Sequence, residues 1–153
     1  MNNEVKITRA TARTITEWAK LYEDKTGDKA ELPAGFKLYF LPERGFAMYK
    51  PDETGKIMLI YRVCGDAKFW HDVAEIIAYQ LGLKCLATII TRNVKAYIRF
   101  WNWTIVEETT IDSQKRFLCH DNQGREVIIT HKGIQKNGEP SYWCTQYLQK
   151  GLV

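Results

Sequence analysis

The stretch TRNVKAYIRFWNWTIVEE, residues 91–108, decides the fold. Asn93 is a favourable residue for capping a helix, and the apolar residues that follow it repeat at helical spacing as far as Trp101. Asn102 tolerates the left-handed conformation in which many helices end, and residues 104–107 then resume a strand pattern. Because an apolar strand precedes it, this stretch predicts a short helix between two strands.

The residues at the amino-terminal end predict a strand, a helix and a three-stranded meander. The strand is expected over residues 5–9, and the helix begins with the capping box Thr14-Ile-Thr-Glu17. Turn-forming residues then separate three strand patterns, over residues 36–41, 46–50 and 56–63. Strands joined by such short turns are antiparallel.

A change of period marks the next unit. Apolar residues spaced by about 3.6 positions predict a helix over residues 68–81, and a continuous apolar run over residues 83–90 predicts a strand covered on both faces. A strand, helix, strand unit of this length favours parallel pairing of residues 56–63 with residues 84–90. These patterns also predict four large core residues: Trp70, Ile77, Ile89 and Phe100.

The last third of the chain predicts three more strands, over residues 116–121, 126–131 and 141–148, separated by Asn-Gly-rich turn signals. These strands would lengthen the sheet. The exposed edge of such a sheet is a candidate surface for a homodimer.

Composition bounds the class of protein. The chain has 153 residues, of which 45% are hydrophobic and 26% charged, as is typical of a soluble globular protein. No apolar run approaches the roughly 18 residues of a membrane span, and the first ten residues lack the apolar segment of a secretory signal. We therefore expect a cytoplasmic protein without a membrane partner. The net charge of +4 selects no partner class.

Cysteine and histidine raise the question of a metal site. The cysteines form no CxxC pair, which favours reduced, buried thiols: Cys64, Cys85, Cys119 and Cys144. Cys119, His120, His131 and Cys144 are of the residue types that zinc prefers. However, adjacent residues of a strand point to opposite faces, so at most three of them converge. We expect no metal.

Basic residues alternate with aromatic ones in the stretch 91–108, a combination that can stack nucleic-acid bases. On a helix, however, Lys95 and Arg99 share one face, whereas Val94, Ile98 and Trp101 share another. This is the ordinary division between solvent and core, and it predicts no nucleic-acid partner.

The order of these elements resembles the GNAT superfamily of acyl-CoA-dependent N-acetyltransferases. EVKITRATARTITEWAKLY, residues 4–22, resembles the family's opening strand and helix, and residues 36–63 resemble its meander. Residues 91–108 resemble the family's pattern of Asn, Ala, Arg-Phe-Tyr and Gly-Phe followed by a strand.

The resemblance implies an α/β (α+β) fold with a mixed central sheet, flanking helices and extra C-terminal strands. It implies one GNAT-like domain over residues 1–153, with a core of about residues 4–110 and a C-terminal β extension of about residues 111–150. It also implies acetyl-CoA as cofactor and an acceptor substrate that the sequence does not identify.

The family's Gln/Arg-x-x-Gly-x-Gly/Ala loop is missing, because the corresponding segment, residues 64–72, reads CGDAKFWHD. In the family, backbone N–H groups of that loop hold the CoA pyrophosphate, and glycines allow the phosphate to approach. Here Phe69 and Trp70 occupy the positions of small residues. We therefore expect weak or absent cofactor binding. By resemblance, any cofactor would be held by Val63, Gly65, Ala67, Lys68 and Asn93.

The catalytic pattern of the family is also incomplete. The family supplies a carboxylate as general base near its fourth strand and a tyrosine as general acid after its short helix. Here KIMLIYRV, residues 56–63, has no acid, and Trp101 occupies the tyrosine position. Tyr97, Tyr61 and Glu75 are substitutes by residue type, and each has an alternative interpretation as a packing or surface residue.

Two functional hypotheses stay open. The first is an acyl-CoA-dependent N-acetyltransferase with an atypical cofactor loop. The second is a non-catalytic protein on the same scaffold, because Gly65-Asp66-Ala67-Lys68 resembles a Gly-x-Ala-Lys segment of phage proteins, including internal virion proteins of short-tailed phages, that are similar to GNAT relatives without the glycine loop. That resemblance implies a virion or host-interaction role, with a protein partner, in the host cytoplasm or the virion.

Overall fold

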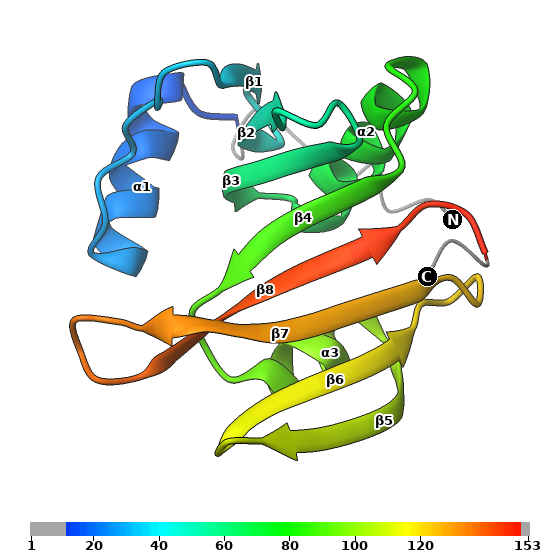
Figure 1. The fold of residues 1–153 in the computed structure, drawn as a ribbon. Coiled ribbons are helices and arrows are strands. Elements are labelled where there is room, and N and C mark those ends of the chain that lie inside the picture. Colours follow the sequence, from blue (N-terminus) through cyan, green and yellow to red (C-terminus); the bar gives the residue numbers. More distant parts are fainter. Residues whose placement is uncertain (1–11, 151–153) are drawn as a thin grey trace, which may run out of the picture. The chain divides into compact units, whose positions relative to one another are not determined.

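A computed structural model describes residues 12–150, which form a mixed α+β fold with three helices and one eight-stranded sheet (Figure 1). The helices are α1 (Ile15–Thr26), α2 (Ala67–Gln80) and α3 (Val94–Trp101). The strands are β1 (Lys37–Leu41), β2 (Gly45–Pro51), β3 (Ile57–Gly65), β4 (Cys85–Ile90), β5 (Thr104–Ile111), β6 (Gln114–His120), β7 (Glu126–Ile134) and β8 (Pro140–Tyr147). The strand predicted over residues 5–9 lies outside the described residues.

The strand order is β1-β2-β3-β4-β8-β7-β6-β5. β3 runs parallel to β4, with Ile57 to Leu59 opposite Cys85 to Ala87, which confirms the predicted strand, helix, strand unit. β4 pairs antiparallel with β8, and β5 to β8 form an antiparallel meander. The C-terminal strands therefore lengthen the sheet as predicted. None of the described helices is long and apolar enough to cross a membrane.

Residues 12–150 divide into two compact units, one made of residues 12–50 and 60–77 and the other of residues 51–59 and 78–150. We call them the first and the second unit and describe each by itself. The prediction that residues 1–153 form one domain stays a prediction.

In the first unit, α1 begins at the predicted capping box. The Thr14 hydroxyl accepts a hydrogen bond from the Glu17 N–H (3.1 Å), and the Glu17 carboxylate accepts one from the Thr14 N–H (2.8 Å). The helix ends at Gly27, whose φ of 77° is left-handed. Its buried residue Trp18 donates from its indole nitrogen to the Pro42 carbonyl (2.8 Å).

Strand β2 is buried on both faces. Phe46 and Met48 belong to a core cluster with Trp18 of α1, whereas the Tyr49 hydroxyl donates to the Trp70 carbonyl of α2. Since successive side chains of a strand point to opposite faces, one face of β2 packs against α1 and the other against α2. This arrangement explains why the five residues from Gly45 to Tyr49 are all buried.

Two glycines of the first unit let the chain cross itself closely. Gly65 has a φ of 105°, and a Cβ there would lie 2.2 Å from the Arg44 carbonyl oxygen and 3.0 Å from the Gly45 Cα. A Cβ on Gly45 would lie 1.9 Å from the Cys64 carbonyl oxygen. The contact between these two segments therefore requires glycine at both positions.

We expect Gly65→Ala to lower the free energy of unfolding by at least about 2 kcal/mol, because alanine adds both backbone strain and a steric overlap with backbone atoms. The matched control is Gly133→Ala in β7, where φ is not left-handed and no atom lies within 4 Å of the added Cβ. We expect the control to change stability by less than about 0.5 kcal/mol. Urea unfolding of both variants measures the difference, and equal effects would contradict the steric explanation.

In the second unit, α3 covers one face of the strands β5 to β8 (Figure 1). Asn93 caps the helix by accepting from the Ala96 N–H (2.9 Å), and Asn102 ends it with a φ of 59°, as predicted. The core of this unit joins the helix to the sheet. It contains Ile90, Val94, Ile98, Phe117, Cys119, Val127, Ile129 and Cys144.

The core prediction is right for Trp70, which is buried, and wrong for Phe100 and Ile89, which are 52% and 38% exposed. Ile77 is partly buried. Phe100 lies two positions beyond the buried Ile98, which turns its side chain by about 200° to the opposite side of α3. Ile89 is wrong for a similar reason.

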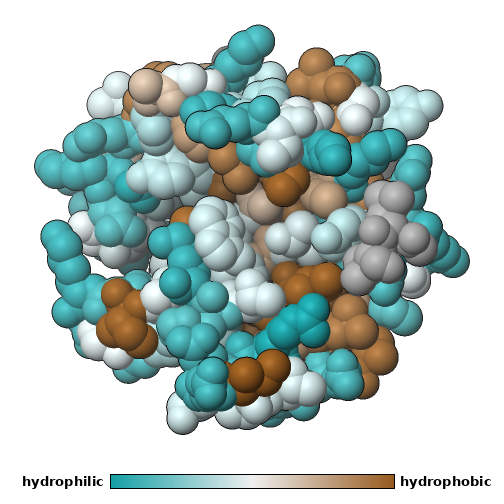
Figure 2. All heavy atoms as spheres, in the orientation of Figure 1, coloured by the Kyte–Doolittle hydropathy of each residue, from teal (hydrophilic) through white to brown (hydrophobic). Residues whose placement is uncertain are grey.

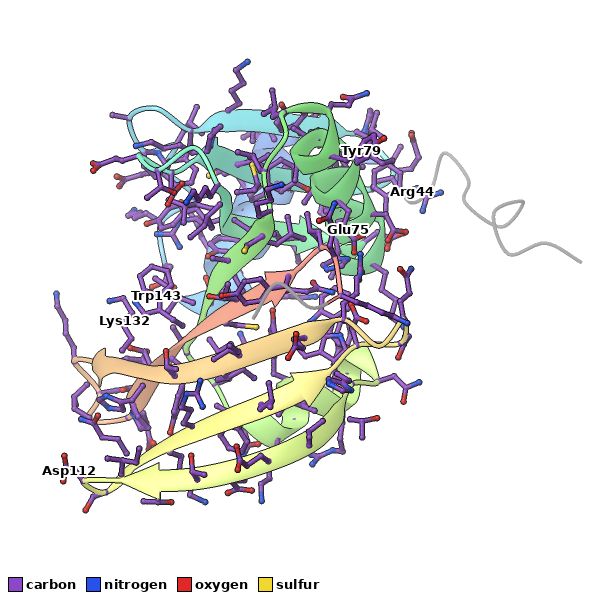
Figure 3. All side chains as sticks on the ribbon, turned by 45° about the vertical axis from the view of Figure 1, so that its right-hand side comes forward. Arg44, Glu75, Tyr79, Asp112, Lys132 and Trp143 are labelled. Carbon is purple, nitrogen blue, oxygen red and sulfur yellow. The ribbon has the colours of Figure 1, made fainter. Side chains whose placement is uncertain are left out.

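Strand alternation places Ile90 on the face of β4 that packs against α3, and Ile89 therefore lies on the other face. There it is opposite Trp143 of β8. Lys132 of β7 lies over the Trp143 ring, with its Nζ 5.7 Å from the centroid (Figure 3). On the face of the molecule shown in Figure 2, apolar residues emerge in small groups among hydrophilic ones, as is ordinary for a protein surface.

Candidate functional site

The predicted cofactor-binding residues belong to both units. Val63, Gly65, Ala67 and Lys68 lie in the first unit, at the end of β3 and the first turn of α2. Asn93 lies in the second unit as the N-cap of α3. The role of these residues toward a cofactor stays a prediction, but the surroundings of the first four can be described in detail.

The first turn of α2 is capped by a side chain of the chain itself. The Asp66 carboxylate accepts a hydrogen bond from the Phe69 N–H (3.1 Å), and its other oxygen lies 2.6 Å from Nη1 of Arg44. The Arg44 guanidinium also lies over the Phe69 ring, 4.7 Å from its centroid. Because a helix N-terminus attracts anions, Asp66 occupies the position in which an external anion would be stabilised.

Trp70 connects the same turn of α2 to the turn that precedes β2. Its indole nitrogen donates to the Arg44 carbonyl (2.8 Å), which also accepts from the Asp66 N–H (2.9 Å). The Phe69 and Trp70 rings meet edge to face with centroids 5.0 Å apart. The two aromatic residues that replace small ones are therefore fixed by specific contacts within the first unit.

Sequence reasoning missed Arg44. The residue lies in the turn between β1 and β2, 22 positions before Asp66, and Figure 3 shows it on the same unit as Glu75 of α2. The only signal in the sequence was the Gly45 that follows it. The crossing of Gly45 and Gly65 brings residues 44 and 66 together, and no local pattern predicts such a crossing.

The three catalytic candidates occupy different surroundings. The Tyr61 hydroxyl accepts from Nη2 of Arg62 (2.8 Å) on the surface of the first unit. The Glu75 carboxylate lies 3.4 Å from Nδ1 of His71, which is one helical turn earlier on α2. Tyr97 packs against the core of the second unit, and burial raises the pKa of its hydroxyl.

A raised tyrosine pKa weakens the hydroxyl as a general acid, because the charged form that remains after proton transfer is desolvated. Arg62 contacts Tyr61 in two ways: it donates a hydrogen bond to the hydroxyl, and its guanidinium carbon lies 4.3 Å from the centroid of the Tyr61 ring. Of the three, Glu75 is the one whose carboxylate lies beside a second side chain able to transfer protons, the imidazole of His71.

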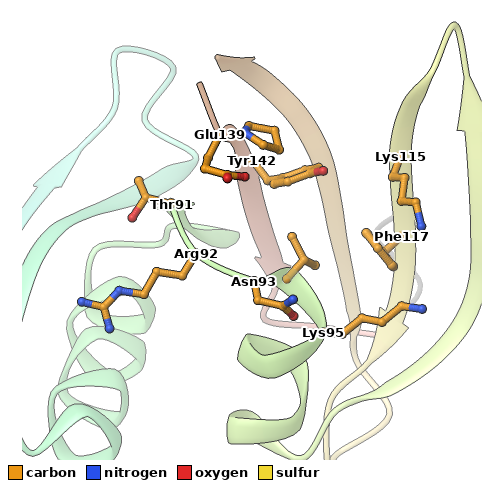
Figure 4. A pocket seen from close by; sticks show the side chains of 10 residues that line it. Thr91, Arg92, Asn93, Lys95, Lys115, Phe117, Glu139 and Tyr142 are labelled. Atoms are coloured by element: carbon orange, nitrogen blue, oxygen red, sulfur yellow. The ribbon is translucent and has the colours of Figure 1, made fainter. Parts of the chain in front are cut away.

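The second unit contains a cavity of about 430 Å³ beside the first turn of α3 (Figure 4). Three basic residues, Arg92, Lys95 and Lys115, line it together with Glu139. Its remaining lining consists of Thr91, Asn93, Val94, Phe117, Pro140 and Tyr142. Asn93, one of the predicted cofactor residues, therefore contributes to a cavity, although its side-chain oxygen is occupied by the helix cap.

Comparison with known proteins identifies the architecture. No family model matches the chain, and no curated protein matches it. Among solved structures, it is similar to Ard1 from Thermoplasma volcanium, with a TM-score of 0.51 and 9% sequence identity over 91% of this chain and 96% of that one. The fold is GNAT-like. At this identity the similarity concerns the fold alone.

The GNAT-like fold confirms the fold class that the order of elements predicted, including the parallel pair β3 and β4 and the helix α2 between them. Function has to be argued from the residues of the site, because one fold supports many activities.

The cysteines and histidines of the second unit are of the residue types that could bind zinc. Among residues 12–150, no group of three or more His, Cys, Asp or Glu side chains is placed to hold a metal ion. Cys119 and Cys144 instead belong to the apolar core, and burial raises the pKa of the Cys119 thiol to about 11. All four cysteines are free and buried, which confirms the prediction of buried thiols.

Proposed function

We propose that this GNAT-fold protein is a non-catalytic binding protein in which the start of α2 does not receive the pyrophosphate of CoA. The observation that carries the proposal is the cap of α2. The Asp66 carboxylate accepts the Phe69 N–H, and the charge of Arg44 is neutralised by Asp66 at 2.6 Å. A pyrophosphate at this position would have to displace a carboxylate of the same sign from its hydrogen bond and its ion pair.

The nature of the partner is part of the same proposal. The resemblance of residues 65–68 to a segment of phage proteins suggests a phage or prophage origin, and with it a virion or host protein as partner. The proposal predicts that the protein acts by binding its partner. Substitution of Glu75 or Tyr61 should therefore leave the affinity for that partner unchanged.

The alternative function is an acyl-CoA-dependent N-acetyltransferase. The observation that favours it is the GNAT-like fold over 91% of the chain, together with the His71 and Glu75 pair on α2 as a candidate base. An enzyme would release CoA thiol from acetyl-CoA in the presence of an amine acceptor, and Glu75→Gln would slow that release.

We expect calorimetric titration of the full chain with acetyl-CoA to show no binding heat below millimolar concentration. Loss of one or two charge-assisted hydrogen bonds, at about 1.5 to 3 kcal/mol each, moves a micromolar ligand toward millimolar affinity. Lys68→Ala is the matched variant, because Lys68 is the exposed cation of the same turn. Micromolar binding that Lys68→Ala weakens would overturn the proposal and favour the enzyme. Circular dichroism of both samples shows that they are folded.

A further inference from the structure

The cavity beside α3 has the size and the lining of a small-molecule site. Its volume of about 430 Å³ falls within the range of about 300 to 1,000 Å³ that is typical of ligand pockets. Four segments of the second unit contribute: the loop after β4, the first turn of α3, strand β6, and the start of β8 with the turn before it. All of them belong to one compact unit.

The cavity forms because α3 covers only part of the sheet face on which it packs. Phe117 belongs to the core beneath α3, and strand alternation places Lys115 on the same face of β6, two residues away. Tyr142 of β8 packs against the same core. The helix begins only at Val94, so the face beside its first turn is left open to a ligand.

Positive charge is concentrated at one end of the cavity. Lys95 and Lys115 reach the same carboxylate, that of Glu108 on β5, with Nζ to oxygen distances of 3.4 and 3.0 Å. These hydrogen bonds, first of all that of Lys115, hold the pKa of Glu108 below its usual range, so the carboxylate is charged at neutral pH. Two ammonium groups against one carboxylate leave one positive charge unbalanced.

The opposite end of the cavity is different. In Figure 4 the Arg92 side chain points away from Lys95 and Lys115, so that it does not add to their charge, and Glu139 lies near Tyr142. Between the two ends, Pro140 supplies apolar surface, and the largely buried Val94 and Phe117 lie beneath it. The lining therefore combines a cationic end, an apolar middle and the phenol of Tyr142.

We propose that this cavity binds a small organic anion, a carboxylate or phosphate monoester attached to an apolar or aromatic group. The anion lies against Lys95 and Lys115, and the apolar group lies on Pro140 and Tyr142. The N–H groups of Val94 and Lys95, in the first turn of α3, have no acceptor within their helix and add donors on the same side. This site is in the second unit and does not depend on the proposed loss of CoA binding at α2.

Phenyl phosphate is a suitable probe, with benzyl alcohol as its uncharged counterpart and inorganic phosphate as the anion alone. Nuclear magnetic resonance titration of the full chain locates binding through its backbone amides. We expect saturable binding of phenyl phosphate, with shifts confined to residues 91–95, Lys115 and Tyr142. Benzyl alcohol should bind at least about tenfold more weakly, because it lacks the charge-assisted hydrogen bonds.

Two substitutions with opposite expected effects make the test specific. Lys115→Gln removes a cation of the site and should weaken phenyl phosphate binding about tenfold, whereas Glu108→Gln removes the competing carboxylate and should strengthen it about fivefold. Lys132→Gln, an exposed lysine over Trp143 on the same sheet, should leave it unchanged. Equal binding of phenyl phosphate and benzyl alcohol, shifts spread over the surface, or equal effects of Lys115→Gln and Lys132→Gln would overturn the proposal.

Discussion

Phe46→Ala is expected to lower the free energy of unfolding by about 3 to 5 kcal/mol. Phe46 is 1% exposed and belongs to the core cluster of Trp18, Met48 and Cys64, with the Tyr22 ring 5.8 Å from its own. Truncation to alanine leaves a cavity between β2 and α1 that these side chains cannot fill without leaving their preferred rotamers. Urea unfolding followed by tryptophan fluorescence measures the loss.

The control for this prediction is Phe100→Ala. It removes the same atoms from a side chain that is 52% exposed on α3, so it should cost less than about 1 kcal/mol. A loss for Phe100→Ala of about 3 to 5 kcal/mol, as large as that expected for Phe46→Ala, would show that Phe100 is buried in solution. In that case the original prediction of Phe100 as a core residue would be right after all.

The fold was predictable because residues close in the sequence determine where its helices begin and end. The capping box of Thr14 and Glu17 starts α1, and Asn93 and Asn102 bound α3, as the sequence predicted. Each of these signals involves residues that are at most a few positions apart. The parallel pairing of β3 with β4 follows in turn from the helix that joins them, because a crossover of this length returns to the same edge of the sheet.

Burial within α3 was harder to predict, since an eight-residue helix contains too few apolar positions to define its buried face. Val94 and Ile98, one turn apart, face the core, and the aromatic residues that follow them lie partly outside it. The sequence pattern alone gave Phe100 the same weight as Ile98. Only the position of the sheet beneath the helix separates the two.

The candidate sites were the part of the structure that local sequence patterns predicted least well. The glycine-poor segment at residues 64–72 predicted a changed cofactor loop, but it did not indicate the pairing of Asp66 with Arg44, 22 positions away. The cavity beside α3 likewise joins Lys95 to Lys115, which are brought together only by the order of strands β5 and β6 in the sheet. Contacts between distant segments require the tertiary structure.

The Asp121 carboxylate accepts four hydrogen bonds within the second unit. It is buried in the turn between β6 and β7, where one carboxylate oxygen accepts from the N–H groups of Gln123 (2.9 Å) and Arg125 (2.8 Å). The other oxygen accepts from Nε of Arg125 (2.7 Å) and from Nε2 of Gln146 on β8 (2.9 Å). Removal of the negative charge would take away this ion pair with a largely buried guanidinium and weaken the hydrogen bonds that the carboxylate accepts.

Burial alone would raise the pKa of Asp121, but the hydrogen bonds from Gln146 and Arg125 outweigh it and hold that pKa below its usual value. A carboxyl whose pKa is lower in the folded state stabilises the fold above the pKa of the unfolded chain, about 3.9 for aspartate. That stabilisation is lost as the pH falls through the lower, folded pKa. The effect of Asp121 is therefore fully present at neutral pH and disappears in acid.

Asp121→Asn is accordingly expected to lower the free energy of unfolding by about 3 kcal/mol at pH 7, near the lower end of the cost of breaking a buried ion pair. The difference from the unchanged protein should shrink as the pH falls below about 4, because the carboxyl of the unfolded chain is protonated first and that of the folded protein at still lower pH. Asp112→Asn is the matched control: it makes the same chemical change at an exposed turn residue with a φ of 52°, which asparagine also tolerates. We expect it to change stability by less than about 0.5 kcal/mol at either pH.

Urea unfolding at pH 7 and at pH 3 measures all three proteins. A loss for Asp121→Asn that stays constant with pH, or that equals the loss for Asp112→Asn, would show that the carboxylate is not the source of the stability of this turn.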